Sequence, residues 1–259
     1  MSEQKIIFFD IDGTLLDHNK NLPASAKAAV LELKQRGHEV AIATGRAPFM
    51  FEELREELDI DSYVSFNGQY VVLRGEVIHT HPLNPTRLQA LTEMALQNNH
   101  AMVYLSSDDM KTTVPNDDFV ETSMKTLKLK LSPGHDPLYH QGRDIYQALL
   151  MCQAHEEVLY ESVCDAFQFI RWHPNSMDVI PAGGSKAAGI AKIIDKLGIA
   201  PEHQYAFGDA LNDLEMLQMI PNSIAMGNAM PEAKAAAKFV TTSVDEDGIR
   251  HGLQMMGLL

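Results

Sequence analysis

The sequence predicts an α/β protein in which a Rossmann-like core domain with a parallel sheet carries an inserted α+β domain. Three observations support this prediction. The first 80 residues alternate short apolar runs with amphipathic helical patterns, which is typical of a parallel sheet covered by helices. The middle of the chain has a more irregular texture, and the first texture returns after Ser185. We therefore expect the core at residues 1–82 and 185–259, and the inserted domain at residues 83–184.

The first elements follow from apolar periodicity and from turn residues. Residues 5–9 read as a buried strand, with an Asp-Gly turn shortly after it. Pro23 suits the first turn of a helix that Gly37 ends. The apolar stripe of that helix comprises Ala26, Ala29, Val30 and Leu33. A strand at 39–43, a helix at 48–58 and a strand at 63–66 complete a βαβαβ order, and residues 70–73 and 77–80 form a hairpin.

The later elements divide between the two textures. In the middle of the chain, helices and strands surround a polar stretch that three prolines interrupt. The expected elements there are a helix at 85–98, strands at 102–105 and 146–151, a helix at 155–165, and strands at 167–172 and 176–180. After Ser185 the expected elements are a helix at 186–197, a strand at 205–207, a helix at 212–219, a strand at 223–226 and a helix at 232–238.

Composition and charge exclude several classes of protein. The 259 residues are 45% hydrophobic, which is enough to fill a core. The formal charge of −14 argues against a surface for nucleic acid or anionic membranes. We see no signal-peptide core and no apolar run long enough to cross a bilayer, so we expect a soluble, cytoplasmic protein. The two cysteines have no metal or redox spacing.

Two acidic residues, Asp10 and Asp12, follow the first strand directly. In open parallel sheets ligands bind at the carboxyl ends of the strands, so both lie where chemistry is usually performed. Two carboxylates this close repel each other unless a cation or a shared proton intervenes. A plain Asp-Gly turn remains the alternative. A calcium loop of the EF-hand type is excluded, because Thr14 and Leu15 replace its third ligand and its glycine.

Two further segments carry groups that bind anions. Thr44-Gly45-Arg46 follows the second strand and could surround a phosphate, although a strand-to-helix turn with glycine is common. Lys186 opens a helix, either as a solvated lysine or as a ligand for an anion. A nucleotide-binding Walker loop is excluded, because the glycine spacing is wrong and Ala187 follows the lysine.

A fourth segment follows the strand at 205–207. Asp209 comes directly behind Gly208, and Asn212 and Asp213 open the next helix. Helix capping would require only one such residue, so this density of polar groups favours a site. Together the four segments place carboxylates, a hydroxyl, an amide and a lysine at one sheet edge, and these groups suit Mg²⁺ and phosphate.

These motifs resemble those of the haloacid dehalogenase-like superfamily, and within it the Cof-type sugar phosphatases. The resemblance covers the whole chain. The four family motifs are matched by Asp10-Ile11-Asp12-Gly13-Thr14, by Thr44-Gly45-Arg46, by Lys186, and by Gly208-Asp209 with Asn212-Asp213. Residues 65–68 and 226–229 also look like this branch. Gln69 and Ala187 depart from it, since alanine and glycine are usual at these positions.

The resemblance implies a phosphatase that acts on small phosphorylated metabolites through an aspartyl-phosphate. Asp10 would be the nucleophile and Asp12 the general acid and base. Mg²⁺ would be held by the carboxylates of Asp10 and Asp209 and by the backbone carbonyl of Asp12. The phosphate would be held by Thr44, Lys186, Asn212 and the backbone amides of Ile11 and Gly45. Asp213 would support these groups from behind, as a partner of Lys186.

The inserted domain would cover the site and select the leaving group. Candidate substrate contacts are Arg46, Asn67, Arg171, His173 and Asn175, with solvated turn residues as the alternative for the last three. A phosphotransferase or mutase with the same intermediate stays open, as does a sensor of phosphorylated metabolites without catalysis. The sequence indicates no partner besides the metabolite, and it leaves the oligomeric state open.

Overall fold

The computed structural model describes residues 4–128, 131–163 and 165–259, which divide into two compact units. The first unit comprises Met1–Gly45, Glu52–His79 and Ser185–Leu259, and the second comprises Arg46–Phe51 and Thr80–Gly184. The predicted fold class is confirmed, because one unit holds a mainly parallel sheet and the other a separate mixed sheet. Residues 83–184 remain our proposed limits for the inserted domain.

The first unit is built on an eight-stranded sheet in the order β14-β13-β12-β1-β2-β3-β4-β5. The strands are β1 (Ile6–Phe9), β2 (Glu39–Ala43), β3 (Ser62–Ser65), β4 (Tyr70–Leu73), β5 (Glu76–Thr80), β12 (Gln204–Gly208), β13 (Asn222–Ala225) and β14 (Phe239–Val240). Neighbouring strands from β14 to β3 are parallel, and β4 runs antiparallel to β3. β1 therefore lies centrally, between β12 and β2.

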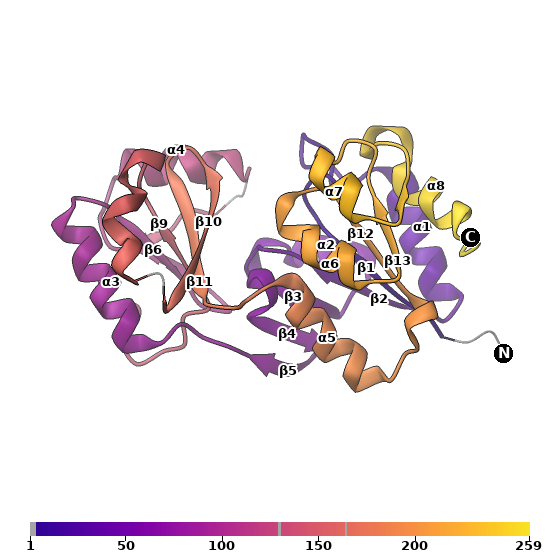
Figure 1. Ribbon diagram of the computed structural model, residues 1–259, viewed down its shortest axis with the longest axis horizontal. Helices are drawn as coiled ribbons and strands as arrows, with labels where there is room; N and C mark the ends of the chain where they lie inside the picture. Colours follow the sequence, from indigo (N-terminus) through magenta and orange to yellow (C-terminus); the bar gives the residue numbers. More distant parts are fainter. Residues whose placement is uncertain (1–3, 129–130, 164) are drawn as a thin grey trace. The chain divides into compact units, whose positions relative to one another are not determined.

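Helices cover both faces of this sheet (Figure 1). On one side lie α1 (Ala24–Gln35), α2 (Glu52–Leu58) and α8 (Gly248–Met255), and on the other α5 (Lys186–Leu197), α6 (Leu214–Met219) and α7 (Pro231–Ala236). Ile6 and Phe8 of β1 pack in one apolar cluster with Ile190 of α5. On the same strand Phe9 stacks on Phe207 of β12. Burial on both faces explains why β1 is apolar at every position.

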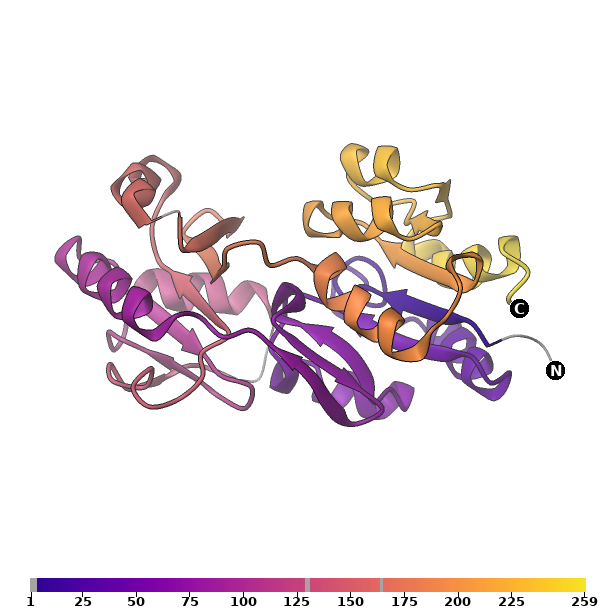
Figure 2. The ribbon, with the colours of Figure 1, turned by 60° about the horizontal axis from the view of Figure 1, so that its bottom comes forward.

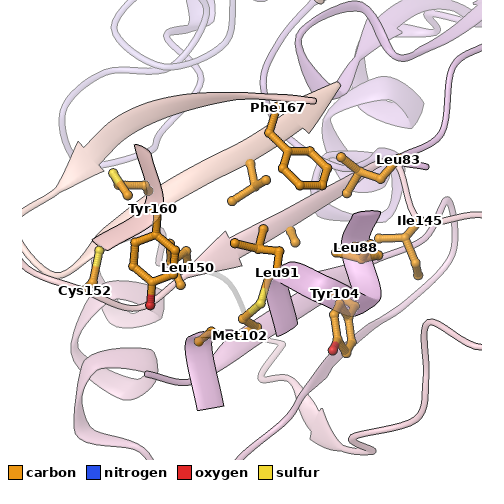
Figure 3. Close-up of a cluster of buried hydrophobic side chains, with 14 of the residues drawn as sticks. Leu83, Leu88, Leu91, Met102, Tyr104, Ile145, Leu150, Cys152, Tyr160 and Phe167 are labelled. Carbon is orange, nitrogen blue, oxygen red and sulfur yellow. The ribbon is translucent and has the colours of Figure 1, made fainter. Parts of the chain in front are cut away.

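The second unit contains a six-stranded mixed sheet in the order β10-β11-β9-β6-β7-β8. Its strands are β6 (Met102–Leu105), β7 (Met110–Thr112), β8 (Gly134–His135), β9 (Gln147–Leu150), β10 (Phe167–His173) and β11 (Ser176–Pro181). Its helices are α3 (Pro85–Gln97) and α4 (Asp118–Thr126). Figure 3 shows the core of this unit, where Leu88 and Leu91 of α3 pack with Tyr104, Leu150 and Phe167 of the sheet.

Short 3₁₀ helices complete the two units. They are η1 (Pro48–Met50), η2 (Phe66–Gly68), η3 (Ala154–Val163), η4 (Pro201–His203), η5 (Leu211–Asp213) and η6 (Val244–Glu246). The helix expected at 155–165 is thus a 3₁₀ helix over its described part, and the helix expected at 48–58 begins as η1. Cys152 is buried in the second unit, whereas Cys164 lies outside the described residues.

Several elements of the structure were not predicted. β7, α4 and β8 occupy the polar stretch with the three prolines, where no apolar period is apparent. α8 lies beyond the last expected helix and packs on α1. Figure 2 shows that α8 and β1, from opposite ends of the sequence, belong to the same unit.

One acidic side chain occupies the middle of the second sheet. Asp178 of β11 pairs with Ile170 of β10 and with Leu149 of β9, whereas its neighbours Met177 and Val179 belong to the apolar core on the other face. No hydrogen bond or ion pair reaches the Asp178 carboxyl from the part of the chain that the structure describes. Burial raises the pKa of Asp178 to about 8.

Candidate active site at the edge of the parallel sheet

The central strand β1 delivers Asp10 to the carboxyl edge of the sheet. The Asp10 amide donates to the carbonyl of Phe207 at 3.0 Å, which continues the pairing of β1 with β12. Beyond Asp10 the chain turns back on itself, since the amides of Leu15 and Leu16 bond the carbonyls of Asp10 and Ile11 at 3.3 and 2.8 Å. The Asp10 side chain is 7% exposed. A carboxylate is thereby buried at the end of an apolar strand.

Gly13 lets this loop approach the segment after β12 closely. Its φ of +84° lies in the left-handed region, and a Cβ placed on it would lie 2.3 Å from Oδ2 of Asp209. The next residue, Thr14, is fully buried and donates its hydroxyl to Oδ1 of Asp209 at 3.0 Å. Asn228 donates its side-chain amide to the carbonyl of Gly13 at 2.8 Å. These contacts fix Asp209 next to the loop that carries Asp10.

Asp213 organises the loop after β12. Its Oδ2 accepts the backbone N–H groups of Asp209 at 2.9 Å and of Ala210 at 3.0 Å. Its Oδ1 accepts from Nζ of Lys186 at 2.6 Å. A Cβ on Gly208 would lie 2.7 Å from the Asp213 carboxyl carbon, so the strand must end in glycine for this side chain to fit. Both oxygens of Asp213 are engaged by the protein itself.

Lys186 joins the two acidic segments. It is the first residue of α5, behind Ser185, whose hydroxyl accepts the amide of Ala188 at 3.3 Å as a helix cap. The Lys186 side chain is buried, and its Nζ contacts Oδ1 of Asp10 at 2.5 Å as well as Asp213. The helix start therefore aims an ammonium group at the nucleophile proposed from the sequence.

The site holds more acid than base. Burial raises the pKa of Asp10 well above its usual value, Lys186 opposes this rise, and the carboxylates of Asp213, Asp209 and Asp12 reinforce it. Burial, with Asp213, raises the pKa of Asp209 to about 7. Burial alone would lower the pKa of Lys186, but Asp10 and Asp213 raise it above its usual value. One ammonium cannot neutralise three carboxylates, so an additional cation is favoured here.

The donor atoms fit a magnesium ion. One oxygen from each of Asp10, Asp209 and Asp213 lies within 4.8 Å of the others. Mg²⁺ prefers oxygen ligands, commonly one or two carboxylates supplemented by waters and phosphate. Because both Asp213 oxygens are already bonded within the protein, Asp10 and Asp209 are the carboxylates best able to face the ion.

Asp12 is held separately from this cluster. Its Oδ1 accepts from Nζ of Lys20 at 2.5 Å, and its side chain is about one-third exposed, at 35%. The backbone at Asp12 forms a bridge with Leu16, within the loop that follows β1. The pair with Lys20 was not predicted from the sequence.

The predicted phosphate-binding residues of the second strand meet those of the fourth motif. The Asn67 amide donates to the carbonyl of Thr44 at 3.0 Å. The side chain of Asn212 donates to Oδ1 of Asn67 at 3.3 Å. A Cβ on Gly45 would lie 3.0 Å from the side-chain nitrogen Nδ2 of Asn67. The structure therefore brings Thr44, Gly45 and Asn212 together around Asn67, which was expected to contact the substrate.

The backbone around Asn67 is strained. Phe66 and Asn67 both have φ of 51°, in the left-handed region that non-glycine residues avoid at a cost of about 1–3 kcal/mol each. Gln69 is buried and donates its side-chain amide to the Asn67 carbonyl at 3.1 Å. Gln69, which departs from the family pattern, thus donates a hydrogen bond to the strained turn.

Four predicted substrate contacts lie in the second unit: Arg46, Arg171, His173 and Asn175. Nε of Arg171 donates to Glu157 at 2.6 Å, and its Nη1 lies 3.0 Å from the carbonyls of Cys152, His173 and Pro174. The amide of Asn175 donates to Nδ1 of His173 at 3.2 Å. Arg171 thus holds the turn between β10 and β11, and a contact of these residues with substrate stays a prediction.

Sequence reasoning missed three residues that shape the site. Thr14 lies inside the first motif, and only its burial reveals that its hydroxyl serves Asp209. Asn228 lies in a segment that resembles the family but carries no role readable from its residues. Lys20 carries no signal, because nothing in the sequence shows that a loop returns it to Asp12.

Among the described residues, no helix is both long and apolar enough to cross a membrane. The family model for haloacid dehalogenase-like hydrolases matches residues 7–253. YkrA of Bacillus subtilis (strain 168), which carries the provisional name of a phosphatase, is 45% identical over 257 residues, 99% of each chain.

Two solved structures are similar over nearly the whole chain. A hypothetical protein from Geobacillus kaustophilus HTA426 is 52% identical, with a TM-score of 0.95 over 99% of this chain and 100% of that one. A sugar phosphatase of subclass IIB of the superfamily is 29% identical, with a TM-score of 0.86 over the same shares. With four motifs meeting at one sheet edge, the chain belongs to the haloacid dehalogenase-like hydrolases, as a phosphatase of the Cof-type branch.

Proposed function

We propose that this phosphatase is magnesium-dependent and hydrolyses phosphate monoesters of small metabolites through an aspartyl-phosphate on Asp10. The observation that carries the proposal is the buried cluster at the edge of the sheet. There Lys186 contacts Asp10 at 2.5 Å, and Asp209 lies within 4.8 Å of Asp10. Sugar phosphates and phosphorylated cofactors are the proposed substrates, and the reducing cytoplasm is the proposed compartment.

Asp10 and Asp12 would divide the chemistry. Asp10 attacks phosphorus, so that one hard hydrolysis becomes two easier steps. Asp12 gives a proton to the leaving alcohol and then takes one from the attacking water, which contributes about 10²–10⁴-fold. Burial of Asp10 limits its access to bulk water, whereas the partly exposed Asp12 can exchange protons with solvent.

The remaining groups bind charge. Carboxylate oxygens of Asp10 and Asp209 and the backbone carbonyl of Asp12 would hold Mg²⁺. When bound, the ion supplies positive charge that stabilises the transferring phosphoryl group. Thr44, Asn212, Lys186 and the amides of Ile11 and Gly45 would bind the phosphate oxygens. At about 4 Å and an effective dielectric near 20, each unit charge contributes around 4 kcal/mol, which outweighs the diffuse acidity of the surface.

The central test replaces the nucleophile. Asp10→Asn should abolish hydrolysis of p-nitrophenyl phosphate while leaving the unfolding midpoint within a few degrees of the wild type. Asp195→Asn changes an exposed aspartate of α5 in the same way and should leave activity unaltered. Full activity of Asp10→Asn would rule out the covalent route. Trapping of radioactive phosphate on the wild type, and its absence from Asp10→Asn, would locate the intermediate.

Two further measurements separate the alternatives. EDTA should stop turnover until Mg²⁺ is restored, and activity that ignores chelation would contradict the metal assignment. A panel of hexose, pentose and cofactor phosphates, assayed with and without added sugar acceptors, distinguishes hydrolysis from phosphoryl transfer. Binding without any turnover across the panel would instead indicate a sensor.

A further inference from the structure

Lys20 lies in a loop whose shape is fixed by one aspartate. The carboxylate of Asp17 accepts the backbone amides of Asn19 and Asn21, both at 2.8 Å, and the side-chain amide of Asn21 at 3.3 Å. The backbone closes around it, because the Lys20 amide donates to the Asp17 carbonyl and the Asp17 amide to the Asn21 carbonyl, both at 2.9 Å. These bonds to Asn21 and Asn19 lower the pKa of Asp17.

This loop holds Lys20 in an unusual conformation. Lys20 has φ of 65°, in the left-handed region where a lysine is rarely found. The backbone bonds around Asp17 maintain that conformation, and from it the lysine side chain reaches back to Oδ1 of Asp12 at 2.5 Å. A strained backbone that serves one side-chain contact points to a function for that contact.

Asp12 has a demanding task in the proposed mechanism. A general acid must lie within hydrogen-bond reach of the atom that it protonates, and a misplacement of about 1 Å can lower a rate about 100-fold. The Asp12 side chain is 35% exposed, so part of it faces solvent and polar contacts help to fix its rotamer. The contact with Nζ of Lys20 is one such contact.

We propose that Lys20, held by the Asp17-centred loop, is a positioning residue that orients the Asp12 carboxylate for proton transfer to the leaving group. This inference rests on the proposed function, because it assumes that Asp12 is the general acid. Lys20 itself acts through Asp12 and takes no part in binding the phosphate.

The test uses leaving groups that differ in their need for a proton. A series of aryl and alkyl phosphates is assayed, from nitrophenyl phosphate to a simple alkyl phosphate, and kcat/KM is measured because it reports the transfer to Asp10 alone. Lys20→Met should lower kcat/KM about 10–100-fold for alkyl phosphates and only about 2-fold for nitrophenyl phosphate. The slope of log kcat/KM against leaving-group pKa should therefore become steeper. Lys20→Arg should restore most of the alkyl-phosphate activity.

A matched control and a second variant sharpen the result. Lys27→Met removes another lysine–carboxylate pair of the first unit, with Glu57 at 3.0 Å, and should change neither slope nor rate. Asp17→Ala loosens the loop and should reproduce the slope of Lys20→Met, with no further effect in the double variant. If Lys20→Met folds poorly, Asp17→Ala still tests the positioning role of Lys20.

Three outcomes would overturn the inference. An equal fall for all leaving groups would show a structural role or a phosphate contact. A rise in alkyl-phosphate activity would show that Lys20 restrains Asp12 in a resting position. An unchanged slope would show that Asp12 is oriented without Lys20. The proposed function fails separately, through an inactive wild type or an active Asp10→Asn variant.

Discussion

Asp178 makes the second unit less stable than an uncharged residue would. The pKa of this carboxyl is about 8 in the folded protein and near 3.8 when exposed, so at pH 7 folding must take up a proton. The 3.2 pH units between 3.8 and 7, at about 1.4 kcal/mol each, correspond to roughly 4 kcal/mol against the folded state. Asp178→Asn removes this penalty and keeps the shape of the side chain.

The sign of the effect follows from the raised pKa. Below pH 3.8 the carboxyl is protonated in both states, and the substitution should change stability little. The gain from Asp178→Asn should grow as pH rises above 3.8 and level off above pH 8. Its full size is on the order of 5 kcal/mol, and a buried amide that lacks a partner will offset part of it.

Urea unfolding between pH 4 and pH 9 measures this gain. Trp172 is the single tryptophan of the chain and lies in β10, the strand next to β11, so its fluorescence follows the second unit. The midpoint of Asp178→Asn should exceed that of the wild type by a margin that increases with pH. A margin independent of pH, or a variant that is less stable at pH 8, would refute the reasoning. A margin independent of pH would mean that folding does not raise the pKa of Asp178.

Three other perturbations probe the active site. Lys186→Met should abolish activity and lower the free energy of unfolding at pH 7 by about 3–5 kcal/mol, because two buried carboxylates lose their ammonium; an unfolding curve like that of the wild type would contradict this. Gly13→Ala should reduce kcat at least 100-fold through its clash with Asp209, whereas Gly37→Ala, with a similar φ of +82° and open space around it, should cost only about 1–2 kcal/mol of stability. Saturating Mg²⁺ should raise the thermal midpoint of the wild type, and Asp209→Asn should lose most of that rise; an equal rise in both would place the ion elsewhere.

The core of the first unit could be predicted because its central strands are also its most buried and most apolar segments. A central parallel strand is apolar on both faces, so β1, β2 and β12 stand out as continuous apolar runs. The polar residues that follow them lie at one edge by topology alone, which is why the sequence suffices to group Asp10, Thr44 and Asp209 in one site.

The parts that could not be predicted depend on contacts between distant segments. β7, α4 and β8 have short or mixed patterns and gain their stability from the sheet they join. η3 has a helical period, and the sequence pattern does not distinguish an α-helix from the 3₁₀ helix that forms there. The pair of Lys20 with Asp12 requires a left-handed backbone conformation at Lys20 and a loop closed by Asp17. Neither feature produces a pattern that can be recognised in the sequence. The burial of Asp178 was not predicted, because polar residues are common at alternate positions of a strand.

The ion pair between Asp10 and Lys186 joins positions 176 residues apart. During synthesis the proposed nucleophile emerges early, and its ammonium partner follows only after the whole second unit has been made. Until then the N-terminal strands lack β12 beside β1 and expose a pairing edge together with an uncompensated acid. The proposed catalytic centre can therefore form only after α5 has been made, and we expect ribosome-bound fragments ending before α5 to be inactive.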